Sequence, residues 1–476
     1  MPRSTGSPVA VVVLALALPL VGCSQSNKTS AHAAPPAVTE PPRAAGGMDT
    51  LGFAHIQHLV VIYLENRSFD NLYGEFRGAD GLASASATDS QRDSSGRIYA
   101  ELPPIPGSLF PAGMPNRPFS IEAFVPADRS TPDLVHRFYQ EQAQIDGGRM
   151  DRFAVVSDAR GLVMGYYHTD SLPLASVAHT YTLCDRFFHA SFGGSFLNHM
   201  WLVAAASPRF PDPPASAVAR IDTLGNLVHD GFVTPDGFAV NTCYSVNSPH
   251  PAGVARNRLL PSLTLPTIGD RLSDRGISWA WYAGGWDDAV AGHADSLFQF
   301  HHQPFVYFAR YADGTSDRGE HLKDERDLLA AIDSGRLPEV SFVKPNGINN
   351  EHPGYTDLMS GERHVADLIA RIQGMPDWKH TAIIVTYDEN GGFWDHVPPP
   401  AVDRWGPGTR VPTLVIAPFA RRHFVDHHTY DTTSILALIE HRWGLAPLGS
   451  RDSMASDMRA AFDFQWEDSP RPSDSR

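Results

Sequence analysis

The sequence predicts an α/β protein whose core is a doubly wound, mostly parallel β-sheet. Residues 58–64 (HLVVIYL) and 381–387 (TAIIVTY) form short, nearly continuous apolar runs rich in β-branched side chains, a pattern typical of strands buried on both faces. Residues 411–417 (VPTLVIA) form a third run of this kind. Helical patterns lie between and after these runs, and strands that alternate with helices indicate a parallel sheet covered by helices.

Two helices are predicted beside these strands. Apolar residues recur at helical spacing within 361–372 and again within 434–443. Asp431 and the two threonines after it offer N-caps for the second helix. The buried faces would consist of Val365, Leu368, Ile369 and Ile372 in the first helix, and of Ile435, Leu438 and Ile439 in the second.

Composition argues against a nucleic-acid partner. The chain has 476 residues, with 38 Lys and Arg against 53 Asp and Glu, so its net charge is −15, whereas nucleic-acid binding requires clustered basic residues. Because 42% of the residues are hydrophobic, the chain can bury a large core. Residues 51–448 are expected to form one large domain. Polar stretches near 85–130, 207–262 and 283–318 interrupt the α/β pattern and are expected to be insertions over its active-site edge.

The N-terminus is interpreted as an export signal. Residues 1–22 contain Arg3 and then an apolar run that is too short to span a bilayer but suits a signal peptide. The run ends at Cys23 in a pattern that resembles the bacterial lipobox, which predicts a lipoprotein anchored through Cys23 to the periplasmic or cell-surface side of a membrane. The alternative is an ordinary secretory signal. Residues 23–50 are predicted to be a flexible tether, and 449–476 a polar C-terminal tail that frays.

Export would place Cys184 and Cys243 in an oxidising compartment. A disulfide between them and two separate buried thiols are both compatible with the sequence, because free cysteine is itself among the most buried residue types. No CxxC zinc pattern is present.

Carboxylates follow two of the predicted strands directly. Glu65 and Asn66 follow the first strand, and Asp388 and Glu389 follow another. A parallel sheet would bring these four side chains to the same edge, where their oxygens suit a hard or borderline divalent cation. Each pair could alternatively cap the next helix. Two pairs at two strand ends favour a metal site.

Ser195 lies in a glycine-rich turn, SFGGSFLNH, before an apolar run that can begin a helix. Two glycines allow the backbone to approach a ligand closely, and the N–H groups at a helix start favour an anion. This layout suits a nucleophile, although it differs from the GxSxG motif of α/β-hydrolases. Taken alone, Ser195 would be interpreted as a helix cap.

Histidines occur in several short motifs that contain turns and aromatic residues. Any single one is more readily explained as a structural residue, but their joint appearance supports convergence on one site. The candidates are His136, His301, His302, His352 and His396.

Six ordered motifs in this chain resemble the bacterial phosphoesterase family, which joins phosphatidylcholine-type phospholipases C with metal-dependent acid phosphatases on an alkaline-phosphatase-like α/β fold. The resemblance extends from about residue 55 to 444. The motifs are ENRSFDNLYG (65–74), HRFYQEQAQIDGGRMDRF (136–153), GGSFLNHMWL (193–202), HHQPFVYF (301–308), EHP (351–353) and YDENGGFWDHVPPP (387–400).

The resemblance implies a role for each matched position. One divalent metal ion of unknown identity would be held by Glu65, Asn66, Ser195, Asp388 and Glu389. Ser195 would be the nucleophile, and His352 is our candidate acid for the leaving oxygen. Asn198, His136, His301 and His302 would surround the phosphoryl group. His396 lies in a matched motif, but its role is left open.

The pattern of Ser195 followed by Asn198 resembles the acid phosphatase branch. The sequence therefore predicts a hydrolase that cleaves phosphate monoesters through a phosphoserine intermediate, and cationic histidines would fit an acidic optimum. A phospholipase C acting on the phosphodiester of a phospholipid headgroup is the main alternative. A metal-free carboxylester hydrolase and a noncatalytic surface lipoprotein are two further alternatives. The expected substrate is a small phosphate ester or a phospholipid.

Overall fold

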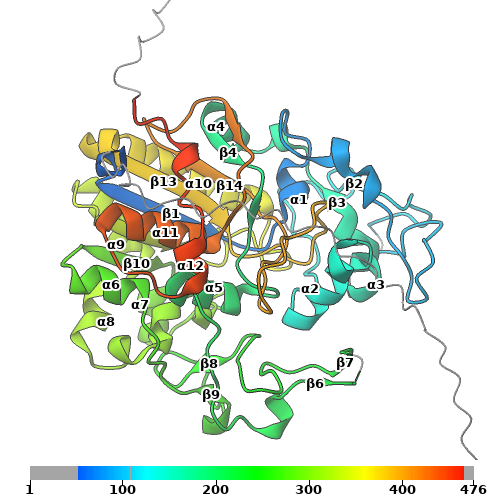
Figure 1. The fold of residues 1–476 in the computed structure, drawn as a ribbon, viewed down its shortest axis with the longest axis horizontal. Coiled ribbons are helices and arrows are strands. Elements are labelled where there is room, and N and C mark those ends of the chain that lie inside the picture. The colour runs from blue at the N-terminus through cyan, green and yellow to red at the C-terminus, as the bar shows by residue number, and fades with distance from the viewer. Residues whose placement is uncertain (1–51, 108, 224, 466–476) are drawn as a thin grey trace, which may run out of the picture. The chain divides into compact units, whose positions relative to one another are not determined.

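The computed structural model describes residues 52–107, 109–223 and 225–465 (Figure 1). An eight-stranded sheet forms the centre. Its strands, in spatial order, are β11 (Leu322–Asp324), β10 (Trp279–Ala283), β12 (Val340–Lys344), β1 (His58–Leu64), β13 (Thr381–Tyr387), β14 (Thr413–Ile416), β4 (Thr182–Cys184) and β15 (Phe424–Asp426). All neighbouring pairs are parallel except those that involve β14. This arrangement confirms the predicted α/β class with a mostly parallel sheet.

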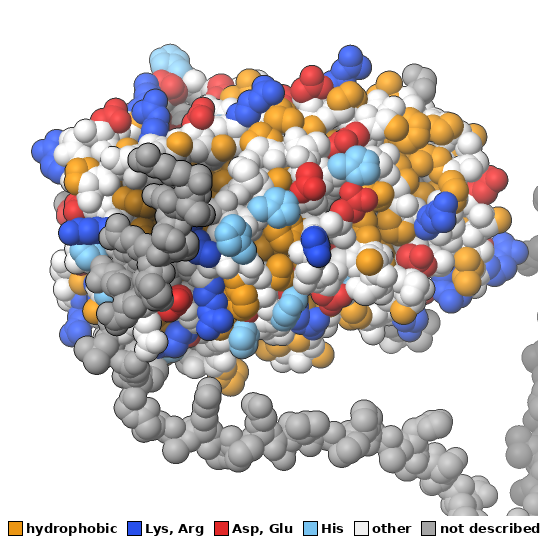
Figure 2. All heavy atoms as spheres, turned by 90° about the horizontal axis from the view of Figure 1, so that it is seen from above, with side chains coloured by type: hydrophobic (Ala, Val, Ile, Leu, Met, Phe, Trp, Pro, Cys, Tyr) orange, Lys and Arg blue, Asp and Glu red, His pale blue; other side chains and the backbone are white. Residues whose placement is uncertain are grey.

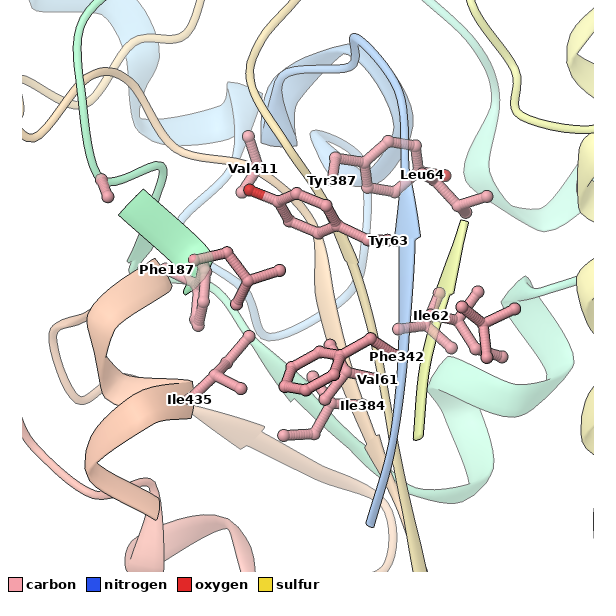
Figure 3. Packing of buried hydrophobic residues seen from close by; sticks show 14 of the residues in the cluster. Val61, Ile62, Tyr63, Leu64, Phe187, Phe342, Ile384, Tyr387, Val411 and Ile435 are labelled. Atoms are coloured by element: carbon pink, nitrogen blue, oxygen red, sulfur yellow. The ribbon is translucent and has the colours of Figure 1, made fainter. Parts of the chain in front are cut away.

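β1 and β13 are the two strands whose bounds the sequence predicted residue for residue. Every residue of β13 is buried, and so are the last six of β1. In Figure 3, Val61 and Tyr63 lie on the same side of β1 as Ile435, whereas Ile62 and Leu64 point to the opposite side. Both faces of the central strands are therefore covered, as a doubly wound sheet requires.

β14 is antiparallel because the chain does not cross the sheet before it. Between β13 and β14, residues 388–412 contain no helix and remain at the carboxyl edge, so the chain re-enters the sheet from that edge. A parallel neighbour would need a crossover connection, usually a helix.

The two predicted helices are present, each slightly longer than the sequence indicated. They are α10 (Leu358–Gln373), which buries the four predicted apolar residues, and α11 (Thr432–Trp443). Asp431 caps α11 as predicted, because its side chain accepts a hydrogen bond from the N–H of Thr433 at 2.7 Å. The other α-helices are α1 (Phe69–Tyr73), α2 (Phe138–Ile145), α3 (Phe153–Val156), α4 (Ala175–Thr180), α5 (Ser195–Ala204), α6 (Ile268–Asp274), α7 (Trp286–Val290), α8 (Ser316–His321), α9 (Glu325–Asp333) and α12 (Ser450–Met454).

Short strands outside the main sheet form four two-stranded pairs. They are β2 (Phe119–Ser120) with β3 (Gly165–Tyr166), β5 (Phe187–Phe188) with β16 (Tyr430–Asp431), β6 (Arg220–Ile221) with β7 (Leu227–His229), and β8 (Tyr244–Ser245) with β9 (Leu259–Leu260). Figure 1 shows β6 to β9, from the predicted insertion at 207–262, below the central sheet.

Part of the predicted polar tail packs onto the domain. Arg451 is 5% exposed and contacts Asp403 and Asp431, while Met458 and Phe462 are buried. Residues 449–465 therefore differ from the expectation of a fraying tail, because this polar segment carries its own apolar anchors and a buried ion-pair partner. The predicted signal peptide, Cys23 and the tether lie outside the described residues.

Cys184 and Cys243 are both buried and not bridged to each other. Among the described residues, no helix combines the length and the apolar character needed to cross a membrane. Basic and acidic side chains are interspersed on the face drawn in Figure 2. That face does not gather charge of one sign.

Candidate metal centre and nucleophile

The four predicted carboxylate and amide ligands meet at the carboxyl edge of the sheet. Leu64 of β1 is paired with Tyr387 of β13, so the residues that follow these two strands are neighbours. The backbone N–H of Asn66 lies 3.3 Å from Oδ1 of Asp388. Glu65, Asn66, Asp388 and Glu389 are all inaccessible to solvent.

A tight turn holds these residues in place. Asn66 has a left-handed backbone with φ of 68°. A Cβ on Gly391 would lie only 2.2 Å from the carbonyl oxygen of Asn66, so only glycine fits there. The N–H of Gly391 also donates to Oε2 of Glu389 at 2.6 Å. Gly391 of the DENGG segment thus allows the close approach of the two loops that carry Asn66 and Glu389.

Ser195 is the first residue of α5, and its hydroxyl lies 3.4 Å from Oδ1 of Asn66. Gly193 precedes it with φ of 86°, and a Cβ there would lie 2.5 Å from the backbone nitrogen of Phe138. The glycine-rich turn therefore brings α5 against α2 and aims the serine at the carboxylates. Ser195 is 6% exposed.

Asn198 lies one turn into α5 and is completely buried. Its side-chain nitrogen donates to the carbonyl oxygens of Ser191 and Gly193, both at 3.0 Å, and its side-chain oxygen accepts from the N–H of Ser191. These bonds use both N–H groups of the amide. Asn198 is thus hydrogen-bonded within the glycine-rich turn that carries Ser195.

The predicted histidines converge on the same edge. His302 contacts Oε1 of Glu65, and His301 lies within the same group of potential ligands. On the other side, Nδ2 of Asn66 lies 3.0 Å from Nε2 of His352 and 3.4 Å from Nε2 of His136.

A cavity of about 120 Å³ opens over Ser195. Two of the predicted insertions, 207–262 and 283–318, contribute residues to its wall and so lie over this edge of the sheet. The lining residues are Glu65, His136, Arg137, Gly194, Ser195, Asn241, Thr242, Gln299, His301, His352 and Tyr355. Tyr355 stacks on His352 with ring centroids 3.9 Å apart.

Burial dominates the electrostatics of the carboxylates. It raises the pKa of Asp388 and, together with the charge of Asp388, raises the pKa of Glu389 well above its usual value. Burial would also raise the pKa of Glu65, but His302 and Lys344 hold it well below its usual value. The negative charges of Asp388 and Glu389 are therefore only partly balanced by nearby positive charges. A bound cation would stabilise their ionised forms.

Burial also decides the charge of the histidines. It lowers the pKa of His301 and His302, and it lowers the pKa of His352 to about 3. The expected cluster of cationic histidines is therefore wrong for these three rings in the free protein, because desolvation disfavours imidazolium. Sequence could not show this burial.

The donor set fits a divalent metal ion. Oε1 of Glu389 and Nδ1 of His301 are buried and have no hydrogen-bond partner within the described part of the chain. Unpaired buried carboxylate oxygens beside an amide oxygen and a hydroxyl are suitable oxygen ligands. Three groups of side chains in the described residues could hold an ion: Glu65 with His301 and His302, Asp133 with His136 and His352, and Asp70 with Asp395 and His396.

His396 belongs to a separate network. Its Nδ1 lies 2.6 Å from Asp70, and Arg410 contacts both Asp70 and Asp395, at 3.2 and 2.8 Å. The buried guanidinium of Arg410 already supplies a positive charge to these carboxylates. This network joins the loop after β13 to α1 and to the segment before β14.

Sequence reasoning missed Lys344 and Asn350. Lys344 is the last residue of β12, and its Nζ lies 3.1 Å from Oε1 of Glu65. Asn350 donates to Oε2 of Glu65 at 3.0 Å. A polar residue at a strand end followed by the Pro-Asn-Gly turn was the available signal for Lys344, by the criterion that identified Glu65 and Asp388.

The molecule is an α/β protein with a buried serine at a helix start and a buried carboxylate cluster, suited to a metal ion, at the carboxyl edge of its sheet. The sequence model of the phosphoesterase family matches residues 56–446, and the chain belongs to that family. This confirms the resemblance seen in the motifs, and the family supports a hydrolase of phosphoric esters.

Curated relatives of this chain are named phospholipases C. Phospholipase C A of Mycobacterium tuberculosis is 28% identical over 456 residues, which cover 86% of this chain and 77% of that one. Non-hemolytic phospholipase C of Pseudomonas aeruginosa is 25% identical and covers 86% and 57% of the two chains. Non-specific phospholipase C1 of Arabidopsis thaliana is 24% identical, with 87% and 72% covered.

One solved structure, an alkaline phosphatase superfamily protein from Vibrio parahaemolyticus, matches with a TM-score of 0.34 at 10% identity, covering 69% of this chain and 73% of that one. This likeness is too remote to bear on function.

Proposed function

We propose that this protein is a metal-dependent acid phosphatase that hydrolyses phosphate monoesters through a phosphoserine intermediate. The observation that carries the proposal is the position of Ser195. Its hydroxyl lies at the start of α5, 3.4 Å from Asn66, and borders a small polar cavity. The first N–H groups of any α-helix have no intrahelical partner and favour an anion such as a phosphoryl group.

Glu65, Asn66, Ser195, Asp388 and Glu389 would hold one divalent ion. When bound, the ion would supply positive charge to the phosphoryl oxygens and lower the pKa of the Ser195 hydroxyl. The side-chain oxygen of Asn66 faces Ser195 while its nitrogen faces His352, so the amide is oriented for ligation through oxygen.

The protein's own groups position the ester. His136 and His301 border the cavity and would contact the phosphoryl oxygens, while His302 orients Glu65. Asn198 would act as a positioning residue, since its amide fixes the turn that carries Ser195. Attack by Oγ on phosphorus would break the bond to the leaving oxygen, and water would then release phosphate from the serine.

His352 remains our candidate for protonating the leaving oxygen. Burial lowers its pKa to about 3, so the free enzyme holds the ring neutral near pH 5 to 7. We infer that the proton enters with the substrate monoanion, which prevails below about pH 6, the second pKa of a phosphate ester. This supports an acidic optimum: kcat/KM should fall as the pH rises through that value.

A phospholipase C is the second candidate, because the curated relatives carry that name. A phosphodiester places a substituent on each side of phosphorus, and a cavity of about 120 Å³ favours the smaller monoester. A phospholipid substrate would require the walls formed by residues 207–262 and 283–318 to admit an apolar group. A membrane anchor on Cys23 stays a prediction.

The test is paired hydrolysis of p-nitrophenyl phosphate and p-nitrophenyl phosphorylcholine by the purified protein, from acidic to neutral pH, before and after treatment with a chelator. We expect higher kcat/KM for the monoester and loss of activity on chelation. Preference for the choline diester would favour phospholipase C. Undiminished hydrolysis after exhaustive chelation would contradict the metal-dependent mechanism.

A further inference from the structure

Lys344 is a fully buried cation directly beside the proposed metal ligands. It ends β12, the strand that pairs with β1 on the side opposite β13. Its Nζ lies 3.1 Å from Oε1 of Glu65, 3.5 Å from Oδ2 of Asp388 and 3.3 Å from the carbonyl oxygen of Leu64. Its side chain has no solvent exposure. These three oxygens match the three N–H donors of an ammonium group.

Two ionised carboxylates repel each other strongly in a dry site unless a cation lies beside them. Removing one partner of a buried ion pair strongly destabilises the folded state, because a charge is then left uncompensated. Lys344 stands between one carboxylate from each ligand-bearing strand, and it is held by the sheet itself. The ammonium is therefore present in the folded chain before any metal arrives.

The charges of the buried cluster balance with a single divalent ion. Glu65, Asp388 and Glu389 contribute three negative charges when ionised, and Lys344 contributes one positive charge. The remaining two negative charges equal the charge of one divalent cation. In two-metal sites a second ion lies about 3.5–4 Å from the first and shares its carboxylates. Here the ammonium occupies the position between Glu65 and Asp388.

We propose that Lys344 is the fixed cation of the centre: it holds Glu65 and Asp388 together in the metal-free protein and limits the centre to one divalent ion. The inference rests on the proposed metal centre. A direct contact with the phosphoryl group is a different role for a lysine in such a site. The side chain has no exposure, and the residues that line the cavity over Ser195 do not include Lys344.

The experiment compares wild type with Lys344→Met, Glu65→Gln and the double variant, using Lys379→Met on the exposed surface as the control. Each protein is freed of metal with a chelator, and its thermal unfolding is measured. Lys344→Met should lower the melting temperature by several degrees, whereas Lys379→Met should leave it unchanged. The double variant should recover much of the loss, because it removes the carboxylate that Lys344→Met leaves unpaired.

Titration of the metal-free proteins with Mn²⁺ in a calorimeter tests the second half of the proposal. Wild type should bind one Mn²⁺ per chain, and Lys344→Met should bind more than one. An unchanged stoichiometry in Lys344→Met, or absence of coupling between Lys344 and Glu65, would overturn the proposal. Failure of wild type to bind Mn²⁺ would refute the proposed metal centre, whereas the coupling in the metal-free protein would still report on the fixed cation.

Discussion

The side-chain amide of Asn66 joins His352 to Ser195: its nitrogen lies 3.0 Å from Nε2 of His352, and its oxygen lies 3.4 Å from the Ser195 hydroxyl. Nδ1 of His352 lies 2.6 Å from the carbonyl oxygen of Pro353, so a neutral ring donates there and presents its Nε2 lone pair to Asn66. One amide therefore orients both the proposed nucleophile and the proposed acid.

Two replacements of Asn66 should separate the effect of losing its amide on activity from the effect of its left-handed backbone on stability. Asn66→Ala and Asn66→Gly both remove the amide, so we expect kcat/KM to fall in both by about 100-fold or more, as for loss of a key electrostatic group. Only alanine is strained at φ of 68°, so Asn66→Ala should also unfold more easily than Asn66→Gly, by about 1 kcal/mol. Urea unfolding and steady-state kinetics measure the two effects. Near-normal activity in Asn66→Gly would contradict the assigned role.

Asn198 provides a test of positioning against direct phosphate binding. Asn198→Asp keeps an acceptor for the N–H of Ser191 but turns a carboxylate oxygen toward the carbonyls of Ser191 and Gly193. We therefore expect Asn198→Asp to be less stable than Asn198→Ala, and both to lose kcat. Both variants are compared with wild type by thermal unfolding and by initial-rate assays. A stable Asn198→Ala whose only defect is a raised KM would instead indicate contact with the phosphoryl group.

The Arg410 network should contribute to stability. Arg410→Met leaves the buried Asp70 and Asp395 without their cation, and we expect the free energy of unfolding to fall by about 3–5 kcal/mol. Arg404→Met is the matched control, because Arg404 pairs with Asp236 at 2.8 Å on the surface, where a pair is worth less than about 1 kcal/mol. The free energy of unfolding is measured with denaturant. Equal losses in the two variants would show that the buried network contributes no more to stability than a surface ion pair.

Glu362 should make stability depend on pH. Burial raises its pKa to about 7, and the N–H of Leu174 donates to it at 2.6 Å. The folded state thus binds a proton more tightly than the unfolded chain, so this contribution is present below the unfolded pKa and is lost as the pH rises toward 7. Relative to Glu362→Gln, wild type should lose about 1–3 kcal/mol between pH 5 and 8.

The control for that comparison is Glu320→Gln, because Glu320 is exposed and its replacement should not alter the pH dependence. Denaturant unfolding at several pH values measures each protein. If the free energy of unfolding changed with pH in the same way in wild type and in Glu362→Gln, Glu362 would be excluded as the source of the pH dependence.

The central strands could be predicted because burial on both faces requires an apolar composition. A strand covered on both faces is apolar at most of its positions, and β1 (HLVVIYL) and β13 (TAIIVTY) are nearly continuous apolar runs. β10 (WAWYA) and β12 (VSFVK) were missed, since runs of only five residues also suit other structures. The antiparallel direction of β14 depends on the path of the loop before it, which no local pattern specifies.

The candidate site could be predicted in its members but not in its electrostatics. Local motifs identified Glu65, Ser195 and Asp388, because strand ends and glycine-rich turns can be recognised from neighbouring residues in the sequence. The inward position of Asn198 and the neutrality of His352 depend on tertiary burial. Lys344 was missed because an isolated lysine is ordinarily exposed and the strand that it ends was not recognised; the sheet order then places it beside Glu65.

The most direct test of the account is to trap the intermediate. Wild type and Ser195→Ala are mixed with p-nitrophenyl phosphate at acidic pH, quenched rapidly in acid, digested and analysed by mass spectrometry. We predict phosphate on the peptide that contains Ser195 in wild type, absence of phosphate from that peptide in Ser195→Ala, and loss of turnover in the variant. Turnover by Ser195→Ala at the wild-type rate would contradict the account.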